Sequence, residues 1–294
     1  MPIPLPPPTL LNPLIQSWLS EDWGRGDRAT LGLFPDPAQS PIWTARIVVK
    51  RSGTIAGLTL ARSIWETVAS LYNTPKPDIE LAVDEGVTCP AKTTVLNISA
   101  PAAVLLMGER VVLNQLGHLS GIATLTKDYA DAIADLPSQL VDTRKTRPGL
   151  RDLEKYAFAV GGGRNHRYGL DDAAMIKDNH ILAAGSIAGA VAAIRQRSPY
   201  PMLIEVETES LQQVEEAIGA GADIIMLDNM PLEMMAAALK RTDGRIKTEA
   251  SGNITRERLR AIAELGVDFI STSAPIMQAT WLDVGLDFVD QSAV

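Results

Sequence analysis

Five apolar segments of strand length recur at nearly regular intervals in the C-terminal half of the chain, and this repeat constrains the fold more than any other feature. They begin at Ala174 (AMIKD), Met202 (MLIEVE), Asp223 (DIIMLD), Arg245 (RIKTEAS) and Val267 (VDFISTS). The residues between them have the apolar spacing of amphipathic helices, with capping signals at Ser210, followed by Gln213, and at Thr255. Alternating strands and helices predict a parallel α/β barrel or a doubly wound sheet.

The chain before this repeat has a different pattern. Residues 41–100 alternate apolar stretches of strand length (IWTARIVV, IAGLTL, DIELAV) with turn signals such as RSGT and DEG, and a helix is expected at 61–72. This pattern predicts a small α+β unit. Residues 102–136 have apolar residues at helical spacing, and we expect them to link the two parts as helices broken near Gly117 and Gly121.

Composition excludes several classes of function. The formal net charge is -8 and the pI is near 5.0, which argues against a nucleic-acid surface or an anionic membrane as the main partner. Cys89 is the one cysteine, so an internal disulfide and a zinc site made of several thiolates are both excluded, and we expect a cytoplasmic protein. The N-terminal MPIPLPPPTLLNPLIQSWL lacks a basic segment, and we expect a polyproline-like tail rather than a signal peptide.

Each strand of the repeat, and a further one at QLVDT, ends in polar or charged residues. These residues are Arg144, Lys145, Lys177, Glu207, Asp228, Ser251 and Ser273. In a parallel α/β barrel such positions converge at the C-terminal face, where catalytic groups lie. A polar strand end taken alone is equally well explained as the start of a solvated loop. The convergence of the whole set predicts a site.

The charges in this set indicate an anionic ligand and a divalent cation. The stretch VDTRKTRPGLR holds four cations within an acidic chain: Arg144, Lys145, Arg147 and Arg151. Glu207 and Asp228 lack obvious local partners, and burying carboxylates is costly unless they meet cations, a metal or hydroxyl groups. Carboxylate and phosphate oxygens are the ligands that Mg²⁺ prefers.

The segment GGGRNHRYG, at residues 161–169, supports the same ligand class. Its glycines allow close approach of the backbone, and they are followed by Arg164, His166 and Arg167. The spacing fits neither the Walker pattern nor a dinucleotide fingerprint. Several arginines around one pocket match a ligand with more than one carboxylate or phosphate group. His118 and His180 are interpreted as structural.

These motifs together resemble those of the quinolinate phosphoribosyltransferases, also called nicotinate-nucleotide pyrophosphorylases (carboxylating). The resemblance rests on GERVVLNQLGHLSGIATLT, on VDTRKTRPGLRDLEKYAFAVGGGRNHRYGLDDAAMIKDNH, and on IEVE, ADIIMLDN and EASGNI, and it extends over nearly the whole chain. It implies a type II phosphoribosyltransferase fold. An N-terminal α/β sandwich domain would cover residues 1–116 and an open seven-stranded α/β barrel residues 117–280, with a strand at about 281–290 returning to the first domain.

The resemblance also implies the reaction and its partners. Phosphoribosyl pyrophosphate (PRPP) and quinolinate would react with Mg²⁺, which binds with PRPP, to give nicotinate mononucleotide, pyrophosphate and CO₂ in de novo NAD biosynthesis. The protein would be a homodimer or a higher oligomer, in the cytoplasm, without a nucleic-acid or membrane partner. Asn253 departs from the family pattern, because a second glycine is usual at that position.

Site residues carry over from the family by their place in the motifs. The quinolinate pocket would consist of Thr143, Arg144, His166, Arg167 and Lys177, completed by Arg110 of the other subunit. PRPP and its phosphates would bind Lys145, Glu207, Asp228, Ser251, Gly252, Asn253, Ser273 and Ala274. Lys145, Glu207 and Asp228 would be catalytic. No direct protein ligand to the metal is certain, and Glu207 and Asp228 are the candidates.

Three other functions remain open from the sequence. A related type II phosphoribosyltransferase would act on nicotinate or another ring acid without decarboxylation, but a monocarboxylate would leave some of the pocket's cations unpaired. A barrel aldolase would use Lys177 as a Schiff-base nucleophile. An anion-binding sensor would have kept the pocket and lost the chemistry, although the presence of both Glu207 and Asp228 favours an enzyme.

Overall fold

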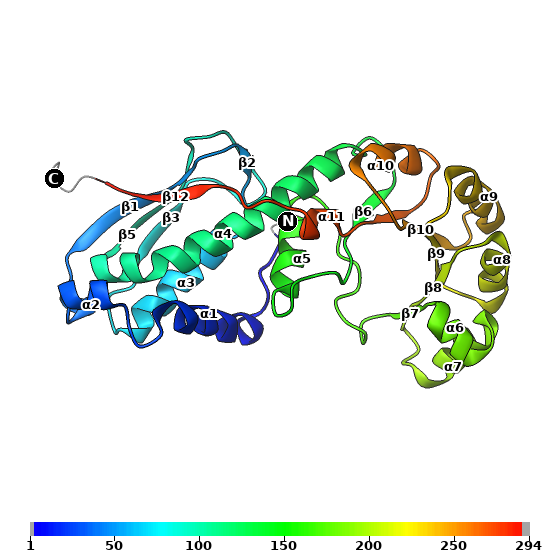
Figure 1. Cartoon of the computed structure of the whole chain (residues 1–294), viewed down its shortest axis with the longest axis horizontal. Coiled ribbons are helices and arrows are strands. Elements are labelled where there is room, and N and C mark those ends of the chain that lie inside the picture. The colour runs from blue at the N-terminus through cyan, green and yellow to red at the C-terminus, as the bar shows by residue number, and fades with distance from the viewer. Residues whose placement is uncertain (1–2, 290–294) are drawn as a thin grey trace. The chain divides into compact units, whose positions relative to one another are not determined.

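The computed structural model describes residues 3–289, which form two compact units (Figure 1). Unit 1 comprises residues 3–127, 147–162 and 278–289, and unit 2 comprises residues 128–146 and 163–277. The domain boundary expected between residues 116 and 117 falls inside one continuous helix, α4 (Ala102–Asp131). The segment 147–162, which the expected boundaries assign to the barrel, lies in unit 1.

Unit 1 is built on a four-stranded antiparallel sheet with the strand order β12-β1-β5-β3. Its strands are β1 (Ile42–Val49), β3 (Asp78–Leu81), β5 (Thr94–Pro101) and β12 (Val284–Phe288), and a separate pair consists of β2 (Gly53–Thr54) and β4 (Thr88–Cys89). The expected C-terminal strand is β12, which pairs with β1 from Ala45↔Phe288 to Val49↔Val284. Residue 290 of the expected range lies outside the described residues.

The helices of unit 1 correct two expectations. They are α1 (Pro8–Trp23), α2 (Arg28–Leu33), α3 (Leu58–Leu71), α4 and α5 (Arg151–Val160), with a 3-10 turn at η1 (Pro37–Gln39). The polyproline-like tail is wrong from Pro8 onward, because Leu11, Ile15 and Leu19 recur every four residues and bury one face of α1. IAGLTL is not a strand: it runs through Gly57, at φ 107°, into the first turn of α3.

Helix α4 is unbroken at Gly117 and Gly121, contrary to expectation. A Cβ at Gly117 would lie 2.9 Å from the carbonyl oxygen of Leu282, and one at Gly121 would lie 2.3 Å from that of Thr280. The glycines therefore allow the returning chain to cross α4 closely, rather than ending the helix. Within residues 3–289 none of the helices combines the length and the apolarity that crossing a membrane requires.

A buried ionic cluster fixes the start of the 147–162 segment within unit 1. Glu154 is fully buried, and its Oε1 lies 3.0 Å from His118 Nε2 and 2.9 Å from Arg147 Nη1. The backbone N–H of Arg147 donates to Glu154 Oε2 at 2.9 Å. Burial alone would raise the pKa of Glu154, but the hydrogen bonds from His118 and Arg147 outweigh it and lower the pKa. His118 is thus structural, as expected, and Arg147 anchors the chain that follows Arg144 and Lys145.

Unit 2 contains the predicted parallel sheet, with the strand order β6-β11-β10-β9-β8-β7. Its strands are β6 (Gln139–Val141), β7 (Ala174–Ile176), β8 (Ile204–Thr208), β9 (Ile224–Asp228), β10 (Lys247–Ser251) and β11 (Phe269–Ser271). Neighbouring strands from β7 to β11 follow the chain order, and β6 lies beyond β11. This is the order of a barrel that stays open between its first and second strands.

The described part of unit 2 has six strands rather than the expected seven. The segment after Gly162 forms only an isolated parallel bridge, between Arg164 and Val141. The residues that follow this bridge form a loop that contains His166 and Arg167. A loop therefore replaces the seventh expected strand.

Helices follow the strands of unit 2 (Figure 1). They are α6 (Asp178–Ala184), α7 (Ile187–Arg197), α8 (Leu211–Ala220), α9 (Leu232–Thr242), α10 (Arg256–Ala263) and α11 (Ala274–Met277). The predicted N-caps are confirmed: Ser210 Oγ accepts from Gln213 N–H, and Thr255 Oγ1 accepts from Arg258 N–H. Helices that begin at fixed caps hold the strand ends, and the loops after them, in place.

The close crossing at Gly121 predicts a large effect of adding one methyl group. Gly121→Ala should lower the free energy of unfolding by about 1–3 kcal/mol, because the new Cβ would overlap the Thr280 carbonyl. Urea denaturation followed by circular dichroism measures this. Gly219→Ala in α8 is the control, since a Cβ there meets nothing within 4 Å and should leave stability equal or slightly higher. Equal stability of the two variants would contradict the packing role of Gly121.

Candidate active site

The strand ends of unit 2 bring an acid and a cation into contact. Lys177 directly follows β7, and the pairing Ile176↔Val206 places it level with Glu207 on β8. The Lys177 ammonium group donates to Glu207 Oε2. Both side chains keep contact with solvent, 44% for Lys177 and 15% for Glu207. Glu207 therefore has the cationic partner that its local sequence does not show.

Asp228 and Ser251 are neighbours at the same edge, because β9 and β10 pair them directly. Asn229 and Asn253 follow these two residues, and Asn253 Nδ2 donates to Asn229 Oδ1 at 2.9 Å. Asn229 Nδ2 in turn donates to Asp228 Oδ2 at 2.7 Å. The edge thus has a connected set of polar side chains.

The turn at Gly252 requires glycine. Its φ is +87°, and a Cβ there would lie 2.3 Å from Asn229 Oδ1. Asn253 follows at φ +50°, a left-handed conformation that asparagine adopts more readily than most residues. The turn is therefore compatible with asparagine at position 253.

The loop after β6 holds three of the predicted residues. Thr143 Oγ1 accepts from the backbone N–H of Lys145 at 3.0 Å, which fixes the turn between them. Arg144 is half-buried, and its Nε is buried without a hydrogen-bond partner among the described residues. Lys145 is exposed. A buried guanidinium N–H that makes no hydrogen bond indicates a place for an acceptor.

Ser273 and Ala274 lie at the start of the short helix α11. The carbonyl oxygen of Ser273 accepts from the backbone N–H groups of Ile276 and Met277. The N–H of Ala274 donates to Thr272 Oγ1 at 3.2 Å. Hydrogen bonds to the Ser273 carbonyl and to the Thr272 side chain thus close this turn.

Arg167 lies close enough to Arg144 for the two charges to oppose each other. Burial, and next the charge of Arg144, lower the pKa of Arg167. Arg167 Nη1 donates to the carbonyl oxygen of Ala173 at 2.7 Å, which holds the guanidinium in place. Two cations held near each other are stabilised by an anion between or beside them. This pair is the clearest electrostatic sign of an anion site in unit 2.

A pocket of about 260 Å³ in unit 2 includes Arg167 in its lining. Its lining includes Arg164, His166 and Arg167 from the loop after Gly162, together with Glu205, Glu249 and Phe269 from the sheet. The volume is near the lower end of the range for small-molecule sites, about 300 Å³. A small ring compound with acidic groups matches both the size and the cations.

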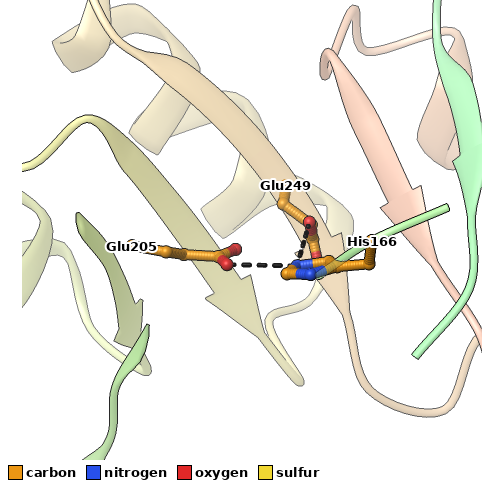
Figure 2. Close-up of side chains that lie close together, drawn as sticks. All are labelled: His166, Glu205 and Glu249. Atoms are coloured by element: carbon orange, nitrogen blue, oxygen red, sulfur yellow. Dashed lines mark ion pairs between the residues drawn. The ribbon is translucent and has the colours of Figure 1, made fainter. Parts of the chain in front are cut away.

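His166 lies between two glutamates in the lining of this pocket (Figure 2). Its Nε2 lies 3.1 Å from Glu205 Oε2 and 3.3 Å from Glu249 Oε2. The backbone N–H of His166 donates to Asp142 Oδ1 at 2.8 Å, and the N–H of Arg167 donates to His166 Nδ1 at 2.7 Å. The imidazole ring is therefore held on both sides, with Nε2 as the atom that donates to the glutamates.

The charges of this cluster depend on one another. Burial alone would lower the pKa of His166, but the hydrogen bonds to Glu205 and Glu249 outweigh it and raise the pKa to about 10. Burial raises the pKa of Glu205, and the charge of Glu249 adds to this, although His166 opposes it. The pKa values of His166 and Glu205 therefore depend on each other.

The structure places the residues proposed from sequence in several local groups: Lys177 contacts Glu207, Asp228 pairs with Ser251, Arg144 lies near Arg167, and only His166 and Arg167 of the set line the pocket. Arg110 lies on α4 in unit 1, and it is exposed. It is not among the residues that line the pocket of unit 2. His180 is structural: its Nδ1 accepts from the backbone N–H of Lys177 at 3.0 Å at the start of α6.

The sequence reasoning missed three acids of the site: Asp142, Glu205 and Glu249. It considered the residues at the strand ends, whereas these acids lie earlier in the strand or directly after it. The alternation of side chains along a strand was an available signal. Glu205 and Glu207 share one face of β8, and Glu249 and Ser251 share one face of β10.

Comparison with known families gives two matches that together cover most of the chain. The profile described as "Quinolinate phosphoribosyl transferase, C-terminal domain" matches residues 122–287. The profile described as "Quinolinate phosphoribosyl transferase, N-terminal domain" matches residues 31–120. The site residues of unit 2 all lie within the first match.

Individual proteins agree with the family profiles. The chain is 49% identical over 288 residues to a probable nicotinate-nucleotide pyrophosphorylase [carboxylating] of Synechocystis, covering 97% of this chain and 95% of that protein. A Bacillus subtilis protein of the same description is 41% identical and covers 94% of this chain and 93% of its own length. The crystal structure of NadC from Streptococcus pyogenes superposes with a TM-score of 0.89 at 37% identity, covering 97% of this chain and 99% of that one.

Proposed function

Because the chain belongs to the quinolinate phosphoribosyltransferase family, we propose that it transfers the phosphoribosyl group of PRPP to quinolinate with loss of CO₂. The products are nicotinate mononucleotide, pyrophosphate and CO₂, in de novo NAD biosynthesis. One structural observation carries the assignment to unit 2: Arg164, His166 and Arg167 line a small pocket, and Arg144 lies close enough to Arg167 for their charges to interact. The enzyme is a pentosyltransferase.

The cations at the pocket match the charge of the proposed acceptor. Quinolinate has two carboxylates on adjacent ring carbons, and PRPP carries several more negative charges. Arg144, His166, Arg167 and Lys177 offset the repulsion between the two reactants and orient the pyridine nitrogen toward the ribose. The guanidinium of each arginine can bind a carboxylate through two N–H groups.

Transfer of the ribose requires negatively charged groups. As pyrophosphate leaves, positive charge develops on the ribose, and Glu207 and Asp228 are placed at adjacent strand ends to stabilise it and to bind the ribose hydroxyl groups. Lys145 is assigned to the region between the two substrates. The turn at Ser251, Gly252 and Asn253, with Ser273 and Ala274, is assigned to the phosphate of PRPP.

The donor set at this edge fits Mg²⁺ bound mainly through PRPP. Glu207 and Asp228 supply carboxylate oxygens, which are hard ligands, but Glu207 is already paired with Lys177 and Asp228 accepts from Asn229. A metal held chiefly by pyrophosphate oxygens needs no more than one or two protein carboxylates. When bound, the ion neutralises charge on the leaving pyrophosphate.

Decarboxylation needs no further cofactor in this proposal. Once the bond between the ring nitrogen and ribose C1 has formed, the ring is a pyridinium. The C2–carboxylate bond then breaks, CO₂ leaves, and its electron pair stays on C2 next to the positively charged nitrogen. A proton taken up at C2 completes nicotinate mononucleotide.

The assembly and location are also part of the proposal. We propose a homodimer, with higher oligomers allowed, in which Arg110 of the other subunit completes the quinolinate pocket; its exposure on α4 suits such a role. We place the enzyme in the cytoplasm, since Cys89 is a free, buried thiol that suits a reducing compartment.

An assay of the purified protein with PRPP and Mg²⁺ tests the substrate. With quinolinate we expect nicotinate mononucleotide and CO₂ in equal amounts, and with nicotinate at the same concentration at most about one hundredth of that rate, because a monocarboxylate leaves cations unpaired. Omitting PRPP is the control. Turnover with nicotinate and none with quinolinate would show instead a phosphoribosyltransferase that does not decarboxylate.

Mixing two inactive variants tests the contribution of Arg110. Arg110→Ala and Lys177→Ala should each lose most activity, roughly a hundredfold or more, because each removes a charged contact to an anionic substrate. After subunit exchange, the mixture should regain up to about a quarter of the wild-type activity, since one site in a mixed dimer holds both residues. A mixture that stays inactive although mass spectrometry shows mixed dimers would assign Arg110 to its own subunit or to no site.

A further inference from the structure

Asn229 connects the ends of two neighbouring strands at the edge that carries Asp228. Its backbone N–H donates to the carbonyl oxygen of Ser251 on β10 at 2.9 Å. Its side-chain Nδ2 donates to Asp228 Oδ2 at 2.7 Å, and its Oδ1 accepts from Asn253 Nδ2 at 2.9 Å. Asn229 is thus bonded both to the acid assigned to the ribose and to the turn assigned to the phosphate.

The carboxylate of Asp228 determines the orientation of both amide groups. An ionised carboxylate only accepts hydrogen bonds, so the Asn229 atom that faces Asp228 must be Nδ2. The other end of this amide, Oδ1, is then an acceptor and requires a donor, which is Nδ2 of Asn253. The two hydrogen bonds therefore run in one direction, from Asn253 through Asn229 to Asp228.

The Asn229 amide also packs closely against the backbone of Gly252. A Cβ at Gly252 would lie 2.3 Å from Asn229 Oδ1 and 2.5 Å from its Cγ. The lack of a side chain at Gly252 therefore leaves the space that this amide occupies. Asn229 and Asn253 have left-handed backbones, with φ +53° and +50°, which asparagine adopts more readily than most residues. The local backbone thus suits this pair of amides.

Asn253 is itself held by the start of helix α10. Arg258, in the first turn of α10, donates from Nη1 to the carbonyl oxygen of Asn253 at 3.1 Å. The N-cap Thr255 accepts from the backbone N–H of Arg258, which fixes this turn of the helix. A series of hydrogen bonds therefore connects the start of α10 to Asp228.

These contacts leave one oxygen of Asp228 for a ligand. Asp228 is half-buried; Oδ2 accepts from Asn229, and Oδ1 accepts no hydrogen bond from the residues between 3 and 289. A carboxylate without a partner samples several rotamers, whereas one bonded at Oδ2 keeps Oδ1 in one direction. A group that is oriented before the substrate arrives contributes more to the reaction than one that must be ordered during it.

We propose that Asn229 and Asn253 are positioning residues for the ribose end of the transfer reaction, and that both act through Asp228. The amide pair (Asn229 and Asn253) holds the carboxylate with Oδ1 toward the ribose of PRPP, where positive charge develops. The proposal rests on the proposed function, because that function assigns Asp228 to the ribose. It assigns the Asn253 side chain to Asn229, which leaves the backbone of the turn for the phosphate.

Two other interpretations of the amide pair make different predictions. If the Asn253 side chain bound the phosphate directly, its removal would have the same effect with or without Asn229. If the pair only stabilised the fold, its removal would lower the unfolding temperature and weaken the binding of both substrates. The positioning role predicts instead that Asn253 matters only while Asn229 is present.

Glycine variants test these alternatives, because glycine removes the amide and tolerates the left-handed backbone. Asn229→Gly should lower kcat/KM for PRPP roughly tenfold, since a hydrogen bond to a charged group is lost. Asn253→Gly should lower it about threefold, since the lost hydrogen bond joins two neutral amides. The double variant should match Asn229→Gly within about twofold, because Asn253 has no further route to Asp228.

Asn73→Gly is the matched control. Asn73 follows α3 in unit 1 and has φ +51°, so both the substitution and the backbone conformation are the same. This variant should leave kcat/KM for PRPP unchanged. A loss equal to that of Asn229→Gly would attribute the effect to added backbone freedom and would overturn the proposal.

Titration calorimetry provides a readout that does not depend on turnover. In Asn229→Gly the Kd of PRPP, measured with Mg²⁺ and without quinolinate, should rise at least about threefold. The Kd of quinolinate alone should stay within about twofold, because its assigned residues are not altered. The same comparison of single and double variants applies to the Kd of PRPP.

Three results would overturn the proposal. The losses in the double variant could be the product of the two single losses, which would assign the Asn253 side chain to the phosphate. Asn229→Gly could leave kcat/KM and the Kd of PRPP unchanged. Alternatively, both substrates could bind more weakly to a protein with a lowered unfolding temperature, which would show a structural role. If the Kd of PRPP changes as proposed but quinolinate is not turned over, the proposed acceptor is wrong and the positioning of Asp228 stands.

Discussion

The burial of two carboxyl groups against one histidine is the interaction on which the rest of the candidate site depends. Glu205 and Glu249 lie on strands of the parallel sheet, so their backbones are fixed by the hydrogen bonds of that sheet. His166 lies on a loop, and it gains a defined position only through these acids and through Asp142. The strands of the sheet therefore fix the position of the loop that carries His166 and Arg167.

The site is divided by charge into two zones of unit 2. The loops after β6 and after Gly162 carry Arg144, His166 and Arg167, and these residues are assigned to quinolinate. Acids at the ends of β8 and β9, Glu207 and Asp228, line the side assigned to the ribose. Lys177 lies at their border through its contact with Glu207. Such a division suits a reaction in which an anionic acceptor meets a sugar that becomes positively charged.

The sequence predicts the parallel sheet and most of the strand-end residues, because both depend on local periodicity. It fails where the deciding partner is distant in the chain. Gly121 looks like a helix break until the carbonyl of Thr280 is known to pass beside it. Glu205 and Glu249 look like ordinary strand residues until the fold places them beside His166. Helix α1 likewise buries one face through Leu11, Ile15 and Leu19. The prolines at the start of the chain do not indicate this helix.

The affinity for quinolinate in the absence of PRPP tests the central claim most directly. Titration calorimetry measures the Kd of quinolinate for the wild type and for Arg167→Ala. Because Arg167 lines the pocket and its guanidinium would bind a carboxylate, the variant should bind quinolinate roughly tenfold or more weakly. Equal affinity of the two proteins would contradict the account.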